Sequence, residues 1–331
     1  MHEQEETVHE HERAVRDHEC VDPWASELQP LEGGYSGETF LVAGGDEEVV
    51  VRIYARDPSR ALIDASLLTL MRGLLPVPEV IEVQPAYADK PAVLVTARMP
   101  GRRLDEVLPR LDEGQLVTVG QHLGRALAIL SGVPQLRFGM FEDEDLRVSR
   151  AGTQLFDLQR SAQRFRDDGR LAAWAQADWE NLVYLLDEAE GIVVGTGREA
   201  TRHVLVHSDF NPKNLLVDPV SLKVTGVLDW EFAHAGSPYA DLGNVTRFER
   251  HPAFVESVVS AFLAEAPPLD LDALRLGRAV DLWALVELAG RPGRNAVQEL
   301  ATTLLLAQAR TQDLHAWPWP TPRVDPAPLA P

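Results

Sequence analysis

Cysteine is almost absent from this sequence: Cys20 is the only one in 331 residues. A lone cysteine excludes a disulfide within the chain and is typical of a reducing compartment, so we expect a cytoplasmic location. No apolar run reaches the length of a membrane span, and the polar first residues contain no hydrophobic stretch like that of a signal peptide. We therefore expect no membrane partner.

Positive charge is also scarce, with 31 Lys and Arg against 51 Asp and Glu, for a net charge of -20. A chain this acidic repels nucleic acids and anionic lipid surfaces, so we expect no nucleic-acid partner. Its field would attract a cationic substrate, but the same charge could serve solubility alone. The composition leaves these two interpretations open.

The remaining composition is that of a globular protein, with 45% hydrophobic and 25% charged residues. A chain of this length can bury a sizeable core as one large domain or two lobes. Residues 1–20 are polar and rich in His and Glu, without the ligand spacing of a zinc site. We predict a flexible polar N-terminal extension there.

The centre of the sequence predicts a β-hairpin. Two short apolar runs, residues 214–218 and 223–228, flank a turn-forming segment. In an antiparallel hairpin the start of the first strand lies beside the end of the second, so Asn214 and Asp229 should meet at its open end. Asp209 lies in the loop just before it. These oxygen-bearing side chains suit a hard cation such as Mg²⁺, although an ordinary hairpin with polar residues at its mouth is the alternative.

The spacing of these residues matches the requirements of kinase chemistry. In kinases an Asp takes or orients the substrate hydroxyl, an Asn five residues later binds one Mg²⁺, and a later Asp binds metal that bridges the ATP phosphates. With His207 placed before Asp209, Asn214 and Asp229, the sequence resembles the aminoglycoside phosphotransferase and choline kinase group of small-molecule kinases. The resemblance implies an α+β, bilobal protein-kinase-like fold with a small antiparallel-sheet N-lobe and a larger, mainly helical C-lobe.

The resemblance also implies roles and cofactors. Asp209 is the predicted catalytic base or hydroxyl-orienting residue, and Asn214 and Asp229 are the predicted Mg²⁺ ligands. Lys213 is predicted to approach the γ-phosphate, with a solvent-facing lysine as the alternative. His207 is predicted to brace the catalytic loop by hydrogen bonding. The expected nucleotide is ATP, with GTP as an alternative.

The first lobe carries the expected nucleotide-binding residues. Gly34, Ser36 and Gly37 lie in a glycine-rich turn, where the backbone can approach phosphate oxygens. Arg52 follows on a β-prone run, at the position of the lysine that binds ATP phosphates in kinases. Asp64 is the acidic residue of the next predicted helix. By resemblance, Arg52 and Asp64 form the pair that kinases usually make from Lys and Glu.

The predicted lobe boundary follows a buried strand that ends in Pro100 and Gly101. By resemblance this strand leads into the linker whose backbone binds adenine, with Thr96, Arg98 and Met99 as candidates. The predicted divisions of the chain are a nucleotide-binding N-lobe (21–99), a catalytic and acceptor-binding C-lobe (100–316) and a Pro-rich extended tail (317–331). A further break is predicted at residues 191–197, where glycines follow a helix.

The expected reaction is phosphoryl transfer to a hydroxyl of a small molecule. In the family the acceptor is most often an antibiotic of the aminoglycoside, macrolide or nucleoside type, which the transfer inactivates. A metabolic kinase for choline, homoserine or an amino sugar is one alternative, and a non-catalytic kinase-like binding protein is another. Glu231 could touch a second metal through water or lie at the surface, and the expected state is a monomer or homodimer.

Overall fold

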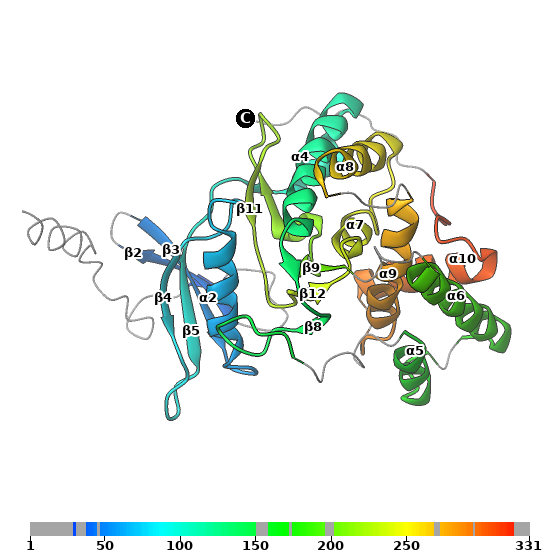
Figure 1. The fold of residues 1–331 in the computed structure, drawn as a ribbon, viewed down its shortest axis with the longest axis horizontal. Coiled ribbons are helices and arrows are strands. Elements are labelled where there is room, and N and C mark those ends of the chain that lie inside the picture. The colour runs from blue at the N-terminus through cyan, green and yellow to red at the C-terminus, as the bar shows by residue number, and fades with distance from the viewer. Residues whose placement is uncertain are drawn as a thin grey trace, which may run out of the picture.

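The computed structural model describes residues 29–30, 38–44, 47–149, 158–171, 174–195, 202–267, 272–293 and 295–320. The predicted extension, residues 1–20, lies outside the described residues, as do Gly34, Ser36 and Gly37. Figure 1 shows the predicted α+β, two-lobed arrangement, with a sheet and one helix on one side and a larger helical body on the other.

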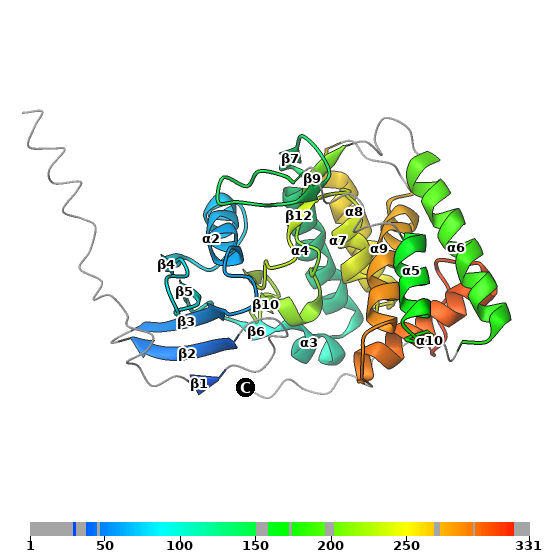
Figure 2. The ribbon, with the colours of Figure 1, turned by 90° about the horizontal axis from the view of Figure 1, so that it is seen from below.

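The N-lobe is an antiparallel sheet with the strand order β1-β2-β3-β5-β4. The strands are β1 (Gln29–Pro30), β2 (Glu38–Gly44), β3 (Glu47–Tyr54), β4 (Val80–Gln84) and β5 (Ala92–Ala97). Side chains alternate along β3, so Val51 and Ile53 face one apolar cluster while Arg52 and Tyr54 face the other side. Helix α2 (Arg60–Met71) covers this second side (Figure 2). The sheet therefore presents Arg52 toward the C-lobe.

The C-lobe combines short strands with long helices. Its strands are β6 (Arg102–Arg103), β7 (Pro134–Gln135), β8 (Gly139–Met140), β9 (His203–Val206), β10 (Leu215–Val217), β11 (Val224–Val227) and β12 (His234–Gly236). Its helices are α3 (Leu104–Val107), α4 (Glu113–Ser131), α5 (Leu158–Asp167), α6 (Gln176–Gly195), α7 (Ala240–Val245), α8 (Pro252–Glu265), α9 (Ala273–Ala289) and α10 (Ala296–Thr311), with the 3₁₀ turns η1 (Leu108–Arg110) and η4 (Pro212–Asn214). The strands form two small antiparallel sheets, β11-β10-β6 and β7-β9-β12-β8.

Helix α4 shows how local sequence builds the helical lobe. It starts with a capping box in which the Asp112 side chain accepts from the Gln115 N–H while the Gln115 side chain accepts from the Asp112 N–H. Its buried face packs closely on α8, because Gly120 and Gly124 leave room for the facing backbone: a Cβ at Gly124 would lie 2.4 Å from the carbonyl oxygen of Val258. Figure 1 shows the two helices side by side.

One prediction about a segment end differs from the structure: helix α6 continues through Gly191, inside the predicted break, and ends at Gly195. Of the predicted Pro-rich extended tail, residues 317–320 form no helix or strand, and Trp317 and Trp319 pack on the apolar core formed by α5, α6, α9 and α10. Residues 321–331 of this tail lie outside the described residues. Among the described residues no helix is both long enough and apolar enough to cross a lipid bilayer.

Candidate active site

The central hairpin forms as its pattern predicts. Strands β10 and β11 pair antiparallel with Leu215 opposite Val227, and the Leu228 N–H donates to the Asn214 carbonyl oxygen at 2.8 Å. This pairing places Asn214 beside the segment that carries Asp229. The predicted geometry of the hairpin mouth is therefore confirmed.

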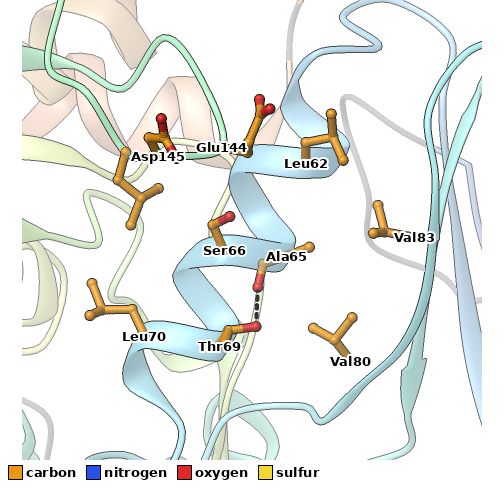
Figure 3. A pocket seen from close by; sticks show the side chains of 10 residues that line it. Leu62, Ala65, Ser66, Thr69, Leu70, Val80, Val83, Glu144 and Asp145 are labelled. Atoms are coloured by element: carbon orange, nitrogen blue, oxygen red, sulfur yellow. Dashed lines mark hydrogen bonds between the residues drawn. The ribbon is translucent and has the colours of Figure 1, made fainter.

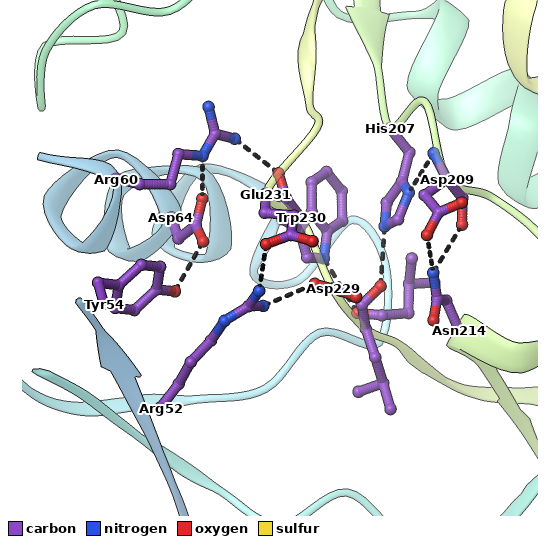
Figure 4. Close-up of polar contacts among 12 residues, drawn as sticks. Arg52, Tyr54, Arg60, Asp64, His207, Asp209, Asn214, Asp229, Trp230 and Glu231 are labelled. Carbon is purple, nitrogen blue, oxygen red and sulfur yellow. Dashed lines mark hydrogen bonds and ion pairs between the residues drawn. The ribbon is translucent and has the colours of Figure 1, made fainter. Parts of the chain in front are cut away.

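Asp209 is fixed by two amide side chains. Asn214 Nδ2 donates to Asp209 Oδ2 at 2.6 Å and to its carbonyl oxygen at 3.0 Å (Figure 4). Asn211 Nδ2 donates to Oδ1 of Asp209 at 2.7 Å. Burial raises the pKa of Asp209, and the nearby charge of Asp229 adds to the increase, while the two amide donors oppose it. The loop thus holds a partly desolvated carboxylate in a defined orientation next to Asn214.

His207 lies entirely inside the protein and braces this loop. Its Nε2 donates to the Leu228 carbonyl oxygen at 3.0 Å, and its Nδ1 accepts the Asp209 N–H at 3.3 Å. Its ring also meets the edge of Trp230, with ring centroids 4.7 Å apart. Burial lowers the pKa of His207 to about 4, so the ring is neutral near pH 7 and can use one nitrogen as donor and the other as acceptor. These contacts support a bracing role for His207.

Asp241 supports the same loop from α7. Its two carboxylate oxygens accept the N–H groups of His207 and Ser208, each at 2.8 Å. Burial raises the pKa of Asp241 to about 7, against the effect of these two donors. Ser208 has left-handed backbone, with φ 69°, and Asn244 Nδ2 donates to its carbonyl oxygen at 3.0 Å. Such backbone persists only when surrounding contacts fix it.

Arg52 joins the N-lobe sheet to the hairpin mouth. Its Nη1 donates to Asp229 Oδ1 at 2.6 Å and its Nη2 to Glu231 Oε2 at 2.5 Å (Figure 4). Burial alone would lower the pKa of Arg52, but Tyr54, Asp229 and Glu231 outweigh it, and the pKa is raised. Burial raises the pKa of Glu231 to about 7, with Asp229 adding to the increase and Arg52 opposing it. One guanidinium thus bridges two carboxylates.

These contacts correct the predicted pairing of Arg52 with Asp64. Asp64 instead accepts from Arg60 Nε and from the Tyr54 hydroxyl, both at 2.7 Å (Figure 4). Arg60 lies one helical turn before Asp64 on α2, where residues four apart are neighbours. Arg60 Nη2 also donates to the Trp230 carbonyl oxygen at 2.6 Å. Asp64 therefore anchors α2 to the segment after Asp229 through Arg60.

The donors at the hairpin mouth fit a magnesium ion. Asn214 uses its amide nitrogen for Asp209, so its Oδ1 is the atom available to a cation, and Asp229 adds a carboxylate. In the described part of the chain no three His, Cys, Asp or Glu side chains form a metal cage. Mg²⁺ usually takes one or two protein oxygens and completes its shell with water and phosphate oxygens. The pair therefore fits Mg²⁺ that binds together with a nucleotide.

The remaining predicted residues lie around this centre. Lys213 is exposed on the 3₁₀ turn that ends at Asn214. Thr96 is buried in β5, and the Arg98 N–H donates to the Glu48 carbonyl oxygen at 3.2 Å. The amide of Arg98 is thus used within the lobe, so the adenine-binding prediction for this residue is limited to its carbonyl oxygen. Met99 follows at the lobe boundary.

A separate pocket of about 500 Å³ lies between α2, β4 and the C-lobe loop with Glu144 and Asp145. Figure 3 shows Leu62, Leu70 and the acidic loop residues around it. Its lining is mainly apolar and includes none of the predicted site residues. It is therefore distinct from the hairpin mouth, on the far side of α2 from the Arg60 and Asp64 contacts.

Sequence reasoning missed two arginines that matter at this site. Arg60 stood in a predicted helix with an acid four residues later, a spacing that could have identified the pair. Arg247 lies close enough to Asp209 to lower the pKa of that carboxyl, and its own partner is Asp281. No local pattern connects these two partners, which are 34 residues apart in the sequence.

Comparisons with known proteins identify relatives of this chain. A family model described as "APH: Phosphotransferase enzyme family" matches residues 27–276. An aminoglycoside 3'-phosphotransferase of Streptomyces fradiae is 26% identical over 259 residues, which cover 70% of this chain and 84% of that protein.

Solved structures share the fold. A thermostable mutant of aminoglycoside phosphotransferase APH(4)-Ia, in a ternary complex with ADP and hygromycin B, has a TM-score of 0.61 at 19% identity, covering 86% of this chain and 92% of the other. A GDP complex of aminoglycoside 2'-phosphotransferase-IIIa has a TM-score of 0.58 at 17% identity, covering 87% and 86%. At these identities the likeness concerns the fold.

Proposed function

Because the chain belongs to the phosphotransferase enzyme family, we propose that it transfers the γ-phosphoryl group of ATP to a hydroxyl of a small molecule, with an antibiotic as the leading acceptor. The observation that carries the proposal is the meeting of Asp209, Asn214 and Asp229 at one end of a hairpin. The curated relative from Streptomyces fradiae, an aminoglycoside 3'-phosphotransferase, supports an antibiotic acceptor. GTP is the alternative donor, since one structural neighbour holds GDP.

Each residue has a defined part in this reaction. Asn214 and Asp229 would hold Mg²⁺, whose charge offsets that of the phosphates when it is bound. Asp209, oriented by Asn211 and Asn214, would accept the proton of the acceptor hydroxyl as its oxygen bonds to the γ-phosphorus. The bond from that phosphorus to the leaving oxygen of ADP breaks, and the products are ADP and a phosphate ester. Since such transition states are loose, positioning and charge stabilisation supply most of the catalysis.

Arg52 would have to exchange partners during nucleotide binding. In the structure its guanidinium neutralises Asp229 and Glu231. The planar guanidinium of Arg52 can also donate to two oxygens of a phosphate group. If it bound the nucleotide in this way, Asp229 would be free to bind the cation. Arg52 and the cation would thus be alternative partners of Asp229.

The test is transfer of label from γ-³²P-ATP to a panel of aminoglycosides, macrolides, nucleosides and amino alcohols, with Mg²⁺ present. Labelled ester on an antibiotic supports the proposal, and label on choline, homoserine or an amino sugar alone identifies the metabolic alternative. Retention of nucleotide without transfer to any acceptor identifies a binding protein. Omission of Mg²⁺ is the control, and it should abolish transfer.

A further inference from the structure

Three arginines gather where the chain leaves α7 and meets α9. Arg247 is bound at two points by Asp281, with Nε donating at 2.7 Å and Nη2 at 2.6 Å, and both side chains are buried. Asn244, three residues before Arg247, donates to the carbonyl oxygen of Ser208 at 3.0 Å, and the charge of Arg247 lowers the pKa of the neighbouring Asp209, the proposed base. The cluster of Arg247, Arg250 and Arg278 therefore lies beside the catalytic loop.

The other two arginines, Arg250 and Arg278, form no ion pair within the described part of the chain, although the charges of Asp281 and Asp313 act on both. Arg250 Nε donates to the Arg247 carbonyl oxygen at 3.3 Å, and Arg278 Nη1 contacts the His315 ring. Arg250 Nη1 and Arg278 Nε are both buried without a hydrogen-bond partner. The Arg278 residue is only 7% exposed.

A third unused donor lies in the same place. The Arg250 guanidinium lies over the ring of Trp317, 5.3 Å from its centroid, and the Trp317 indole N–H is also buried without a partner. Buried polar groups in native proteins are nearly always hydrogen-bonded, so three unpaired donors in one cluster require an explanation. All three donate and none accepts, which is the arrangement that an anion would satisfy.

The charges of the arginines also favour an anion at this cluster. Burial lowers the pKa of Arg278 to about 9, and the neighbouring Arg250 lowers it further, while Asp313 and Asp281 oppose this. Burial lowers the pKa of Arg250 to about 10. Both remain charged near pH 7, and desolvated positive charge is unfavourable unless it is paired.

We propose that Arg250, Arg278 and the indole N–H of Trp317 bind an anionic group, a carboxylate or a phosphate, carried by the phosphoryl acceptor. The proposal rests on the proposed function, because it concerns the acceptor of the same active site. Among the candidate acceptors it favours one that carries a carboxylate or a phosphate over a polycationic aminoglycoside. Guanidinium groups recognise both anions through paired N–H donors, which is why the two are named together. The overall negative charge would attract cations, but this cluster would repel a positively charged acceptor locally.

Binding of small anions tests the site without knowledge of the acceptor. Calorimetric titrations with malonate and with inorganic phosphate use the full chain saturated with Mg²⁺ and a non-hydrolysable ATP analogue, so that the nucleotide site is filled. Arg278→Gln should weaken anion binding about 10- to 100-fold, the effect of losing a charge-assisted hydrogen bond. Arg275→Gln is the matched control, because Arg275 lies on the same helix but is exposed and reaches Glu188. This control should bind anions as the wild type does.

Acceptor pairs distinguish the two anions. Transfer rates are compared for L-homoserine against 3-amino-1-propanol, which lacks the carboxylate, and for glycerol 3-phosphate against glycerol. In one of the two pairs, the wild type should have a higher kcat/KM for the anionic acceptor than for the neutral one. Arg278→Gln should remove most of that difference and leave the affinity for nucleotide unchanged. The preferred pair identifies the anion.

Two results would overturn the proposal. One is that the wild type binds no anion, or that the wild type and Arg278→Gln bind it equally. Together with a lowered melting temperature of the variant, this would make Arg278 a structural residue. The other is equal transfer by the wild type to the anionic and the neutral member of both acceptor pairs, which would mean that the cluster does not contact the acceptor. In either case normal nucleotide binding and transfer to a neutral acceptor would leave the proposed function standing.

Discussion

At the scale of single residues, Arg52 holds together the two carboxylates at the hairpin mouth. Asp229 has left-handed backbone, with φ 64°, and its carboxylate lies close to that of Glu231. Two neighbouring carboxylates repel each other when buried, and the bridging guanidinium offsets this repulsion. Arginine suits this position because its fork reaches both acids at once, which a lysine ammonium does less well.

Replacement of Arg52 tests this role. Arg52→Met should strengthen the binding of Mn²⁺, used as a spectroscopic substitute for Mg²⁺, in the absence of nucleotide, because the cation no longer competes with a guanidinium for Asp229. The same variant should bind ATP about 10-fold more weakly, since a charged hydrogen bond to phosphate is lost. Electron paramagnetic resonance measures free Mn²⁺. Arg72→Met, which removes an exposed arginine from the end of α2, should change neither affinity.

At the scale of elements, the contact of α7 with α9 positions the catalytic loop. Gly243 and Gly277 allow the two helices to meet at backbone distance: a Cβ at Gly243 would lie 2.1 Å from the Gly277 carbonyl oxygen. Because α7 carries Asp241, which holds the N–H groups of His207 and Ser208, any shift of α7 would move Asp209. The glycine contact is thus part of the active-site support.

Gly243→Ala should lower both stability and activity. Overpacking of this kind destabilises a protein by about 1–3 kcal/mol. Urea unfolding measures the stability, and the transfer assay should show a lower kcat. Gly191→Ala is the matched control, because a Cβ at Gly191 on α6 meets nothing within 4 Å. A helical Gly to Ala change should there raise stability by about 0.5–1 kcal/mol.

The buried ion pair of Arg247, two residues past the end of α7, with Asp281 on α9 gives a second prediction at this scale. Arg247→Met leaves the Asp281 carboxylate buried without its partner and should lower the free energy of unfolding by about 3–5 kcal/mol. The double variant Arg247→Met with Asp281→Leu removes both charges and should recover most of that loss. A double variant no more stable than the single one, in urea unfolding, would contradict this account of the pair.

Strand β12 makes the fold sensitive to acid through His234. Burial lowers the pKa of His234 from its ordinary value of 6.5 to about 4. Between these values the unfolded chain binds a proton that the folded chain does not, so this contribution to stability is full above pH 6.5 and decreases as the pH falls toward 4. Glutamine does not titrate, so the free energy of unfolding of His234→Gln should fall by about 2 kcal/mol less than that of the wild type between pH 7 and pH 5. Urea unfolding at the two pH values measures this difference. Equal losses in the two proteins would contradict the assignment.

At the scale of the whole molecule, the sequence predicted what depends on local pattern. The two apolar runs around residues 214–228 predicted the hairpin and the position of its mouth. Helix α6 runs on past Gly191 because a helical glycine costs only about 1 kcal/mol, which packing against α9 and α10 can outweigh.

The parts that could not be predicted depend on how the lobes and helices meet. Which carboxylates Arg52 reaches depends on the position of β3 over the hairpin, 177 residues away in the sequence. The arginine cluster likewise joins α7, α9 and the segment after α10, and each arginine alone resembles a surface residue in the sequence. Contacts between charged residues far apart in the sequence are set by tertiary packing, so no local sequence spacing predicts them.

The most direct test of the central claim is the rate of phosphoryl transfer by Asp209→Asn, measured alongside its affinity for ATP with Mg²⁺. The side chain keeps its size and can still contact Asn214, but it can no longer accept the proton of the acceptor. We predict a kcat lower by about 10²- to 10⁴-fold with an unchanged nucleotide affinity. Transfer at the wild-type rate would contradict the assignment of Asp209 and, with it, the reaction proposed for this hairpin mouth.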